Sequence, residues 1–274
     1  MRPTGRYVVS LVVALAVSFA LCDCAMSITG AEILKRVSAR HDKFMSSVKD
    51  WQIEQEMIIV QGGQEVTSAM KSMWKGDKYR VEMTSSGSAG GGQMPKMTTV
   101  VVFDGKDTWT VSPFVGKRRL KPSEVKDATP RIQWSDKLKD RVRLVGKEKV
   151  DGREAYVIDV NQTGAEASGS LPFSKVWVDT ANYQMLKGEL KMQDKPAEMR
   201  FSDFRKVYGD FTMPFLQQVF VGGVPQTKIV TKSIKTNVGL SDDLFDASKL
   251  EGEQGKQEMN MEQMQEMIKR MQGN

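Results

Sequence analysis

The side chains able to act as nucleophiles, metal ligands or proton carriers are few in this chain. Among its 274 residues there is one histidine, His41, and there are two cysteines, Cys22 and Cys24. The sequence has neither the G-x-S-x-G motif of serine hydrolases nor the H-E-x-x-H motif of zinc enzymes. We therefore expect a protein that is not an enzyme and needs no cofactor or metal. A catalytic carboxylate pair hidden among the 34 acidic residues is the alternative that remains open.

Three aspartates near the end of the chain form the densest acidic group. Asp242, Asp243 and Asp246 lie close together, but their spacing lacks the glycine turn and distal glutamate of a calcium loop. Ser241 before them is a typical helix-capping residue. The pattern therefore predicts a capped helical turn that closes the domain between residues 239 and 250, rather than a metal site.

The first 27 residues have the order of a secretory signal peptide. Arg2 and Arg6 precede an apolar run over residues 7–21, and small residues follow at 25–27. This run is shorter than the roughly 20 residues of a spanning helix, which disfavours the alternative of an uncleaved anchor. We expect export to the periplasm and a mature chain without cysteine. A second alternative is a membrane-anchored lipoprotein acylated on Cys22 or Cys24.

Composition and charge exclude several classes of protein. Hydrophobic residues make up 40% of the chain and charged residues 27%, and the mean hydropathy is −0.40, which excludes a multi-span membrane protein. The net charge is +6, and +5 without the signal segment, but Lys117-Arg118-Arg119 is the only tight basic cluster. No nucleic-acid-reading motif accompanies it. Anionic head groups or an acidic partner surface are the expected targets of this charge.

The periodicity of apolar residues predicts one helix followed by many strands. Thr29 and Glu32 form a capping-box pattern at the start of a helix that ends near residue 47. Two D-G pairs, at 104–105 and 151–152, predict tight hairpins. Alternating residues predict about eleven strands joined mostly by short turns. They lie within residues 51–59, 70–74, 79–83, 97–113, 141–150, 154–160, 175–178, 185–192, 198–207, 215–221 and 228–236.

Three segments do not fit the strand pattern. Residues 85–92, rich in glycine and serine, predict a loop, and residues 114–130 together with 132–138 predict an irregular lid with short helices. Residues 251–274 carry a methionine stripe at helical spacing, which predicts a packing face, a partner-binding face or a disordered tail. The expected organisation is thus a signal peptide at 1–27, one domain at 28–250 and a Met-rich tail at 251–274.

A sheet of this size must cover its apolar face. Strongly twisted sheets of about ten strands curl, which makes one face concave. A helix of about 18 residues is roughly 27 Å long and cannot cover all the apolar side chains of such a face. We therefore expect an apolar ligand-binding cavity. The candidate cavity residues are Met57, Ile59, Met70, Trp74, Val101, Phe103, Trp109, Phe114, Leu144, Trp177, Leu190, Phe201 and Val219.

Several segments, in this order, resemble the LolA-type periplasmic lipoprotein carriers and the longer outer membrane lipoprotein-sorting branch of that family. The resemblance covers nearly all of the mature chain. It is carried by M-W-K-G-D-K-Y-R-V-E-M (residues 73–83), V-V-V-F-D-G-K-D-T-W-T-V-S-P-F-V-G-K (100–117), G-K-E-K-V-D-G-R-E-A-Y-V-I-D-V (146–160), K-V-W-V-D (175–179) and L-S-D-D-L-F (240–245).

This resemblance implies a mainly β fold, an incomplete antiparallel β-barrel whose open side is covered by helices. It implies a monomeric carrier that binds lipoprotein acyl chains or other lipid reversibly and meets transport partners at the inner and outer membranes. Family members have an arginine before the third strand that helps to control cargo release, whereas this chain has Lys75-Gly76-Asp77 there. The alternatives are an envelope sensor or structural module that binds a protein partner, and a lipid-active hydrolase.

Overall fold

The computed structural model describes residues 28–61, 64–89, 92–113, 116–121, 124, 140–161, 173–190 and 195–250. The predicted signal peptide, most of the predicted lid and the Met-rich tail lie outside these residues. Those three assignments therefore stay predictions.

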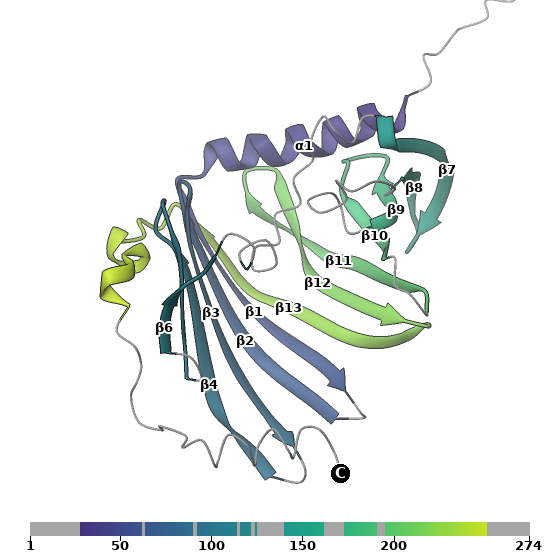
Figure 1. Cartoon of the computed structure of the whole chain (residues 1–274). Coiled ribbons are helices and arrows are strands. Elements are labelled where there is room, and N and C mark those ends of the chain that lie inside the picture. Colours follow the sequence, from purple (N-terminus) through teal and green to yellow (C-terminus); the bar gives the residue numbers. More distant parts are fainter. Residues whose placement is uncertain are drawn as a thin grey trace, which may run out of the picture.

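One antiparallel sheet of 13 strands makes up most of the described chain, in the order β6-β5-β4-β3-β2-β1-β13-β12-β11-β10-β9-β8-β7. It is strongly curved (Figure 1), as the sequence predicts. The strands are β1 (Asp50–Gln61), β2 (Gln64–Lys75), β3 (Lys78–Ala89), β4 (Gly92–Phe103), β5 (Thr108–Ser112), β6 (Gly116–Arg119), β7 (Val142–Val150), β8 (Arg153–Val160), β9 (Phe173–Asp179), β10 (Met185–Leu190), β11 (Ala197–Tyr208), β12 (Phe211–Val221) and β13 (Val224–Thr236).

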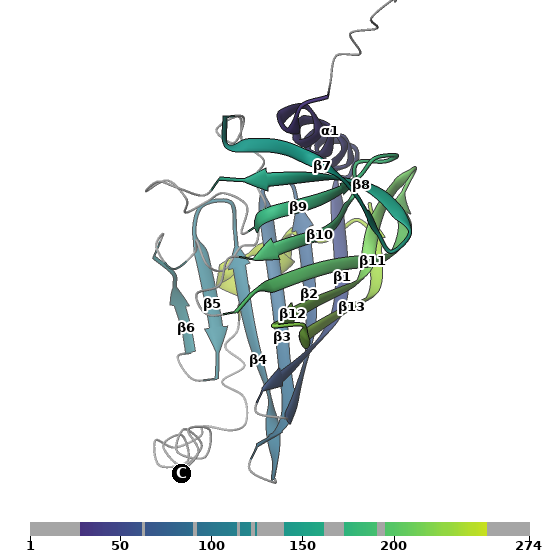
Figure 2. The same ribbon diagram turned by 90° about the vertical axis from the view of Figure 1, so that its right-hand side faces the viewer.

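The sheet consists of two meanders joined along one seam. Strands β1 to β6 follow one another in space as in sequence, and so do β7 to β13. The seam is the antiparallel pair of β1 and β13, in which Trp51 lies opposite Thr236 and Met57 opposite Ile229. In the part of the chain that the structure describes, β6 and β7 are the two edges and do not pair with each other (Figure 2). The barrel is therefore incomplete.

Helix α1 (Gly30–Ser47) lies across one end of the curved sheet and runs from beside β7 to the start of β1 (Figure 1). The predicted capping box is confirmed, because the Thr29 side chain accepts from the Glu32 backbone and the Glu32 carboxylate accepts from the Thr29 backbone at 2.8 Å. Ile33 and Leu34 are buried against β8 and β9, where Ile158 and Val176 are 0% exposed. This contact forms the main hydrophobic core.

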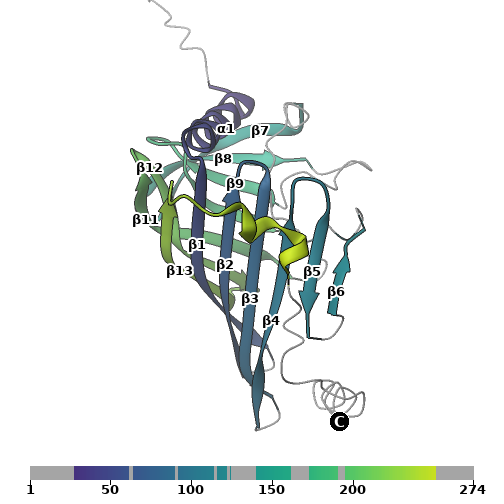
Figure 3. The ribbon, with the colours of Figure 1, turned by 90° about the vertical axis from the view of Figure 1, so that its left-hand side faces the viewer.

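The chain ends, in the described part, with a segment that we call the C-terminal segment (residues 240–250). It contains the short 3-10 helices η2 (Asp242–Phe245) and η3 (Ala247–Lys249), and it lies on the outer side of β1 to β4 (Figure 3). The predicted cap is confirmed, because the Ser241 hydroxyl accepts from the Asp243 backbone. Phe245, Ala247 and Leu250 are buried there in a second cluster with Met73 and Val102.

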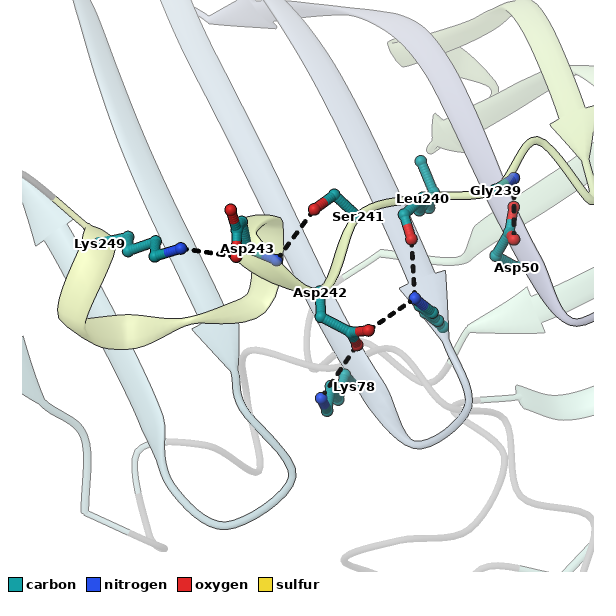
Figure 4. A network of polar contacts seen from close by, with 9 residues as sticks. Asp50, Lys78, Gly239, Leu240, Ser241, Asp242, Asp243 and Lys249 are labelled. Carbon is teal, nitrogen blue, oxygen red and sulfur yellow. Dashed lines mark hydrogen bonds and ion pairs between the residues drawn. The ribbon is translucent and has the colours of Figure 1, made fainter.

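Lysines of the β2–β3 hairpin hold the C-terminal segment in place (Figure 4). The Lys75 ammonium donates to the Leu240 carbonyl at 2.8 Å and to the Asp242 carboxylate at 2.9 Å. Lys78 donates to the other oxygen of Asp242 at 3.2 Å. These hydrogen bonds, from Lys75 first and then Lys78, keep the pKa of Asp242 below its ordinary value. The predicted capping role of this acidic group is thus joined by an ion-pairing role.

Two sequence predictions of irregular structure are wrong. Residues 116–119, expected in the lid, form the edge strand β6, and residues 85–89 and 92, expected in a loop, extend the β3–β4 hairpin. Both segments lack the apolar alternation that predicts a strand. Backbone hydrogen bonding to a neighbouring strand suffices where both side-chain faces are polar or small.

Candidate functional site

The two faces of the sheet are distinguished by what covers them. The C-terminal segment covers Met73, Val102 and Val111, and Figure 3 shows it on the side of β1 to β4 away from β7 to β9. Because side chains alternate along a strand, Phe103 and Trp74 point the opposite way, toward the concave side. We call that side the inner face.

Strand register extends the inner face across both meanders. Met57 on β1 lies opposite Ile229 on β13, and Val219 on β12 lies opposite both Thr227 on β13 and Met199 on β11. Directly opposed residues of antiparallel strands share a face. Met199 in turn packs against the core beneath α1. The inner face is thus one continuous surface, covered by α1 at one end.

Ten of the predicted cavity residues share this inner face, brought together from seven strands. They are Met57, Ile59, Met70, Trp74, Val101, Phe103, Leu144, Leu190, Phe201 and Val219. All ten are half-buried. Leu144, Leu190 and Phe201 lie at the α1 end and pack on the main core, whereas the other seven lie on β1, β2, β4 and β12. Phe114 lies outside the described residues.

Trp109 does not lie on the inner face, which corrects the sequence prediction. Phe103 pairs with Thr108 across the hairpin, so Trp109 pairs with Val102 and points outward. Its indole packs in the cluster beneath the C-terminal segment, and the Lys117 ammonium lies 5.7 Å from the ring centroid. The D-G signal located the hairpin, but the four residues of its loop decide which flanking residues share a face.

Trp177 is also on the outer face, a second correction. It packs with Val157 and Leu186 on the side of β8 to β10 opposite the α1 core. Its indole nitrogen donates to Glu148 at 2.7 Å, and the Lys187 ammonium lies 4.3 Å from the ring centroid. The sequence K-V-W-V-D is apolar on both faces, so alternation alone could not orient this tryptophan.

Charge separates the two faces sharply. On β1 to β5, every inner-face position whose side chain the structure describes is uncharged, from Trp51 to Ile59 on β1 through to Ser112 on β5. The outer face of the same strands carries ion pairs, including Arg80 with Glu82 at 2.6 Å and Glu56 with Lys232 at 2.6 Å. The inner face is therefore suited to apolar material, and the outer face to water.

A row of aromatic residues crosses the inner face next to α1. Trp51, Trp74, Tyr79 and Phe103 lie directly opposite one another on β1 to β4. The Trp51 and Trp74 rings stack at 4.2 Å between centroids, and the Tyr79 and Phe103 rings lie at 5.6 Å. The sequence prediction missed Trp51 and Tyr79. The two-residue turn Gly76-Asp77 was a signal that could have found Tyr79, because it places Trp74 opposite that residue.

Helix α1 is held over this row by its second half. The Phe44 ring stacks on Phe211 at 4.2 Å and meets the edge of Trp51 at 5.6 Å. The Arg40 guanidinium lies 4.4 Å from the Phe211 centroid and donates to the Thr212 carbonyl at 3.0 Å. Burial lowers the pKa of Arg40. The helix thereby bridges β1 of one meander and β12 of the other.

The described residues contain no group of three or more His, Cys, Asp or Glu side chains able to hold a metal ion. They also contain no helix that is both long and apolar enough to cross a membrane.

The fold defined by these elements is an open, curved antiparallel sheet with a helix across one end, and solved structures share it. A DUF1329 family protein from Desulfovibrio piger is 21% identical, with a TM-score of 0.57 over 81% of this chain and 98% of the other. A Vibrio parahaemolyticus structure described as an outer membrane lipoprotein-sorting protein domain is 17% identical, with a TM-score of 0.55 over 80% and 97%.

A LolA superfamily protein from Nitrosomonas europaea is also similar, at 17% identity and a TM-score of 0.50 over 80% of this chain and 98% of the other. The neighbours thus include LolA superfamily and lipoprotein-sorting proteins, which confirms the fold resemblance seen in the sequence. A family model described as an uncharacterized protein matches residues 124–252, just under half of the chain. No curated protein matches the sequence.

Proposed function

We propose that the protein is a periplasmic carrier that binds the acyl chains of a lipoprotein or another lipid on the inner face of its sheet. The observation that carries this proposal is the uncharged, half-buried apolar area over Met57, Ile59, Met70, Val101 and Phe103. Apolar surface of this kind is commonly a binding site. The similarity to lipoprotein-sorting structures supports the same class of ligand.

Binding in this proposal is reversible packing without covalent chemistry. Acyl chains lie along the inner face of β1 to β4, β13 and β12, where Ile229 and Val219 continue the apolar surface. The energy comes from removing hydrocarbon from water, at about 0.8 kcal/mol per buried methylene group. Release needs an acceptor that offers equal burial. Export by the N-terminal segment and transfer toward the outer membrane belong to the same proposal, and the protein acts as a monomer and not as an enzyme.

Two neighbouring isoleucines of β1 allow a sharp test. Ile59 lies on the inner face and Ile58 on the outer face, and both are half-buried. Ile59→Asp places a charge in the apolar area and should weaken binding of a fluorescent fatty acid at least about tenfold, whereas Ile58→Asp should leave it within about twofold.

Native mass spectrometry of the protein purified from the periplasm is the companion measurement. Co-purified lipid or acylated protein supports the carrier. Equal effects of the two isoleucine variants, or a wild-type protein that binds no lipid, would overturn the proposal. Hydrolysis of an ester lipid during incubation would instead indicate a lipid-active enzyme, and stable capture of an unacylated protein would indicate the sensor or structural module.

A further inference from the structure

Two polar atoms at the α1 end of the inner face have no hydrogen-bond partner among the described residues. The Tyr79 hydroxyl and the Trp51 indole nitrogen are both buried, and Tyr79 as a whole is 8% exposed. A buried polar group without a partner is costly, and proteins satisfy most of them. Such a pair on a candidate binding face calls for a partner beyond the described residues.

Both atoms belong to the aromatic row, which fixes where they lie. Trp51 and Tyr79 flank Trp74, each directly opposite it in the register of β1, β2 and β3. Adjacent strands are about 4.8 Å apart, so the two residues start about 10 Å from each other across the sheet. This separation matches two acceptor groups of one ligand molecule, or of two chains lying side by side.

The chemistry of the two groups limits what they can recognise. An indole N–H only donates, and a tyrosine hydroxyl donates or accepts, so the pair requires a hydrogen-bond acceptor. The inner-face positions described on β1 to β5 carry no charge, whereas phosphate and carboxylate sites are commonly built with Arg or Lys. A neutral carbonyl oxygen therefore fits better than an anionic head group.

The apolar area lies on one side of the row only. From Trp51, Trp74 and Phe103, the inner-face side chains continue away from α1 through Ile53, Met57, Met70 and Val101. Toward α1, Phe44 packs against Trp51. A ligand with a carbonyl at the row can thus extend its hydrocarbon only along the strands, away from the helix.

We propose that Tyr79 and Trp51 form a recognition site for the ester or amide carbonyls of an acylated ligand, and so set its direction on the sheet. This inference rests on the proposed lipid-binding function and deepens it. The carbonyl end lies beside α1, and the acyl chains run along β1 to β4 toward the far hairpins. The head group then projects at the α1 end of the molecule.

The test compares two probes that differ only in their two ester carbonyls, 1,2-dipalmitoylglycerol and its diether analogue 1,2-di-O-hexadecylglycerol. The wild-type protein should bind the ester about three to ten times more tightly than the ether. Tyr79→Phe and Trp51→Phe should each reduce this ratio, with little change in affinity for the ether. Tyr208→Phe, at an exposed tyrosine, should leave both affinities unchanged. The Trp51 indole N–H resonance should shift more with the ester than with the ether.

The outcomes separate the two proposals. Binding of both probes with equal affinity, or an ester preference that survives in both variants, overturns the carbonyl site and leaves the lipid-binding function intact. Failure of the wild-type protein to bind either probe overturns both. Tyr79→Phe removes only one oxygen that has no partner, and retention of the wild-type circular dichroism and ether affinity shows that a loss of ester preference is local.

Discussion

The Tyr79 hydroxyl is expected to lower the stability of the lipid-free protein while it contributes to ligand binding. Its ring is buried against Phe103, yet its hydroxyl lacks a hydrogen bond from the described residues. Replacing a buried hydroxyl that has no partner by hydrogen removes a desolvation cost. We expect Tyr79→Phe to stabilise the lipid-free protein by about 1 kcal/mol.

Urea denaturation of the lipid-free protein measures this effect. Tyr208→Phe provides the control, since its hydroxyl is exposed to water and its loss should change the free energy of unfolding by less than about 0.5 kcal/mol. A destabilised Tyr79→Phe protein would show that the hydroxyl has an internal partner.

Orientation of single side chains marks the limit of what the sequence could predict for the site. Met57, Ile59, Met70, Val101 and Phe103 share one face in the structure. Their own sequence does not orient them, because residues 57–60 (M-I-I-V) and 100–103 (V-V-V-F) are apolar on both faces. Trp109 and Trp177 were misplaced because hairpin loop length and strands apolar on both faces leave orientation undetermined. The face on which such a side chain lies is set by its partners on the adjacent strands, and not by its neighbours in the sequence.

At the scale of single elements, β10 depends on a residue without a side chain. A Cβ atom added at Gly188 would lie 2.4 Å from the ring of Phe173, which is 1% exposed and packed in the core under α1. Because that ring has no room to move, Gly188→Ala should destabilise the protein by about 2 kcal/mol. Thermal unfolding measures the change.

A double variant tests the cause of this loss. Phe173→Ala removes the three ring atoms that would meet the new methyl group, so Gly188→Ala should cost less stability in the Phe173→Ala protein than in the wild type. Additive losses in the double variant would show that the methyl group is harmful for another reason.

The attachment of the C-terminal segment should depend on acid. Lys75 and Lys78 lower the pKa of Asp242 below 3.8 in the folded protein, so this contact stabilises above pH 3.8 and is lost as the pH falls through the lowered pKa. Asp246, whose pKa is lowered by hydrogen bonds from Ser248, acts in the same direction. We expect Asp242→Asn to weaken the segment's attachment near neutral pH.

Hydrogen-exchange protection of residues 240–250 measures this attachment. At pH 6 the Asp242→Asn protein should show less protection than wild type. The difference should shrink below pH 3.8 and vanish once the pH is below the lowered pKa of Asp242, where the wild-type carboxyl is also protonated. Asp210→Asn, at a fully exposed ion pair with Lys206, is the matched control. A difference that persists at low pH would assign the effect to something other than charge.

The elements themselves were largely predictable, and the exceptions share a physical cause. Helix α1 and most strands follow from capping residues and alternation, whereas β6 contains only glycine and basic residues. An edge strand with solvated side chains carries no hydrophobic period. Its position is fixed by backbone pairing to β5, and no pattern within residues 116–119 predicts that pairing.

For the molecule as a whole, Phe44 is the contact that connects the two meanders through α1. It is 3% exposed and touches Trp51 on β1 and Phe211 on β12. Truncating it removes packing on both sides at once, so Phe44→Ala should cost about 3 to 5 kcal/mol of the free energy of unfolding.

Circular dichroism during urea denaturation follows that loss. Lys43→Ala, one residue earlier on the exposed side of the helix, should cost less than about 0.5 kcal/mol. Equal costs for the two variants would mean that α1 contributes through its own helicity and not through the bridge.

The seam pairs the first strand of the sequence, β1, with the last, β13. The sheet can therefore be completed only after β13 has been synthesised. The first strand begins at Asp50 and its partner at Val224, so a chain emerging from its N-terminus carries an unpaired β1 edge until nearly the whole domain has been synthesised. Exposed edges recruit other strands and promote aggregation. A nascent chain that stops before Val224 would present open edges on both β1 and β12, whereas the last strand closes both in a single step. Only a chain that includes β13 can therefore pair both of these edges and complete the sheet.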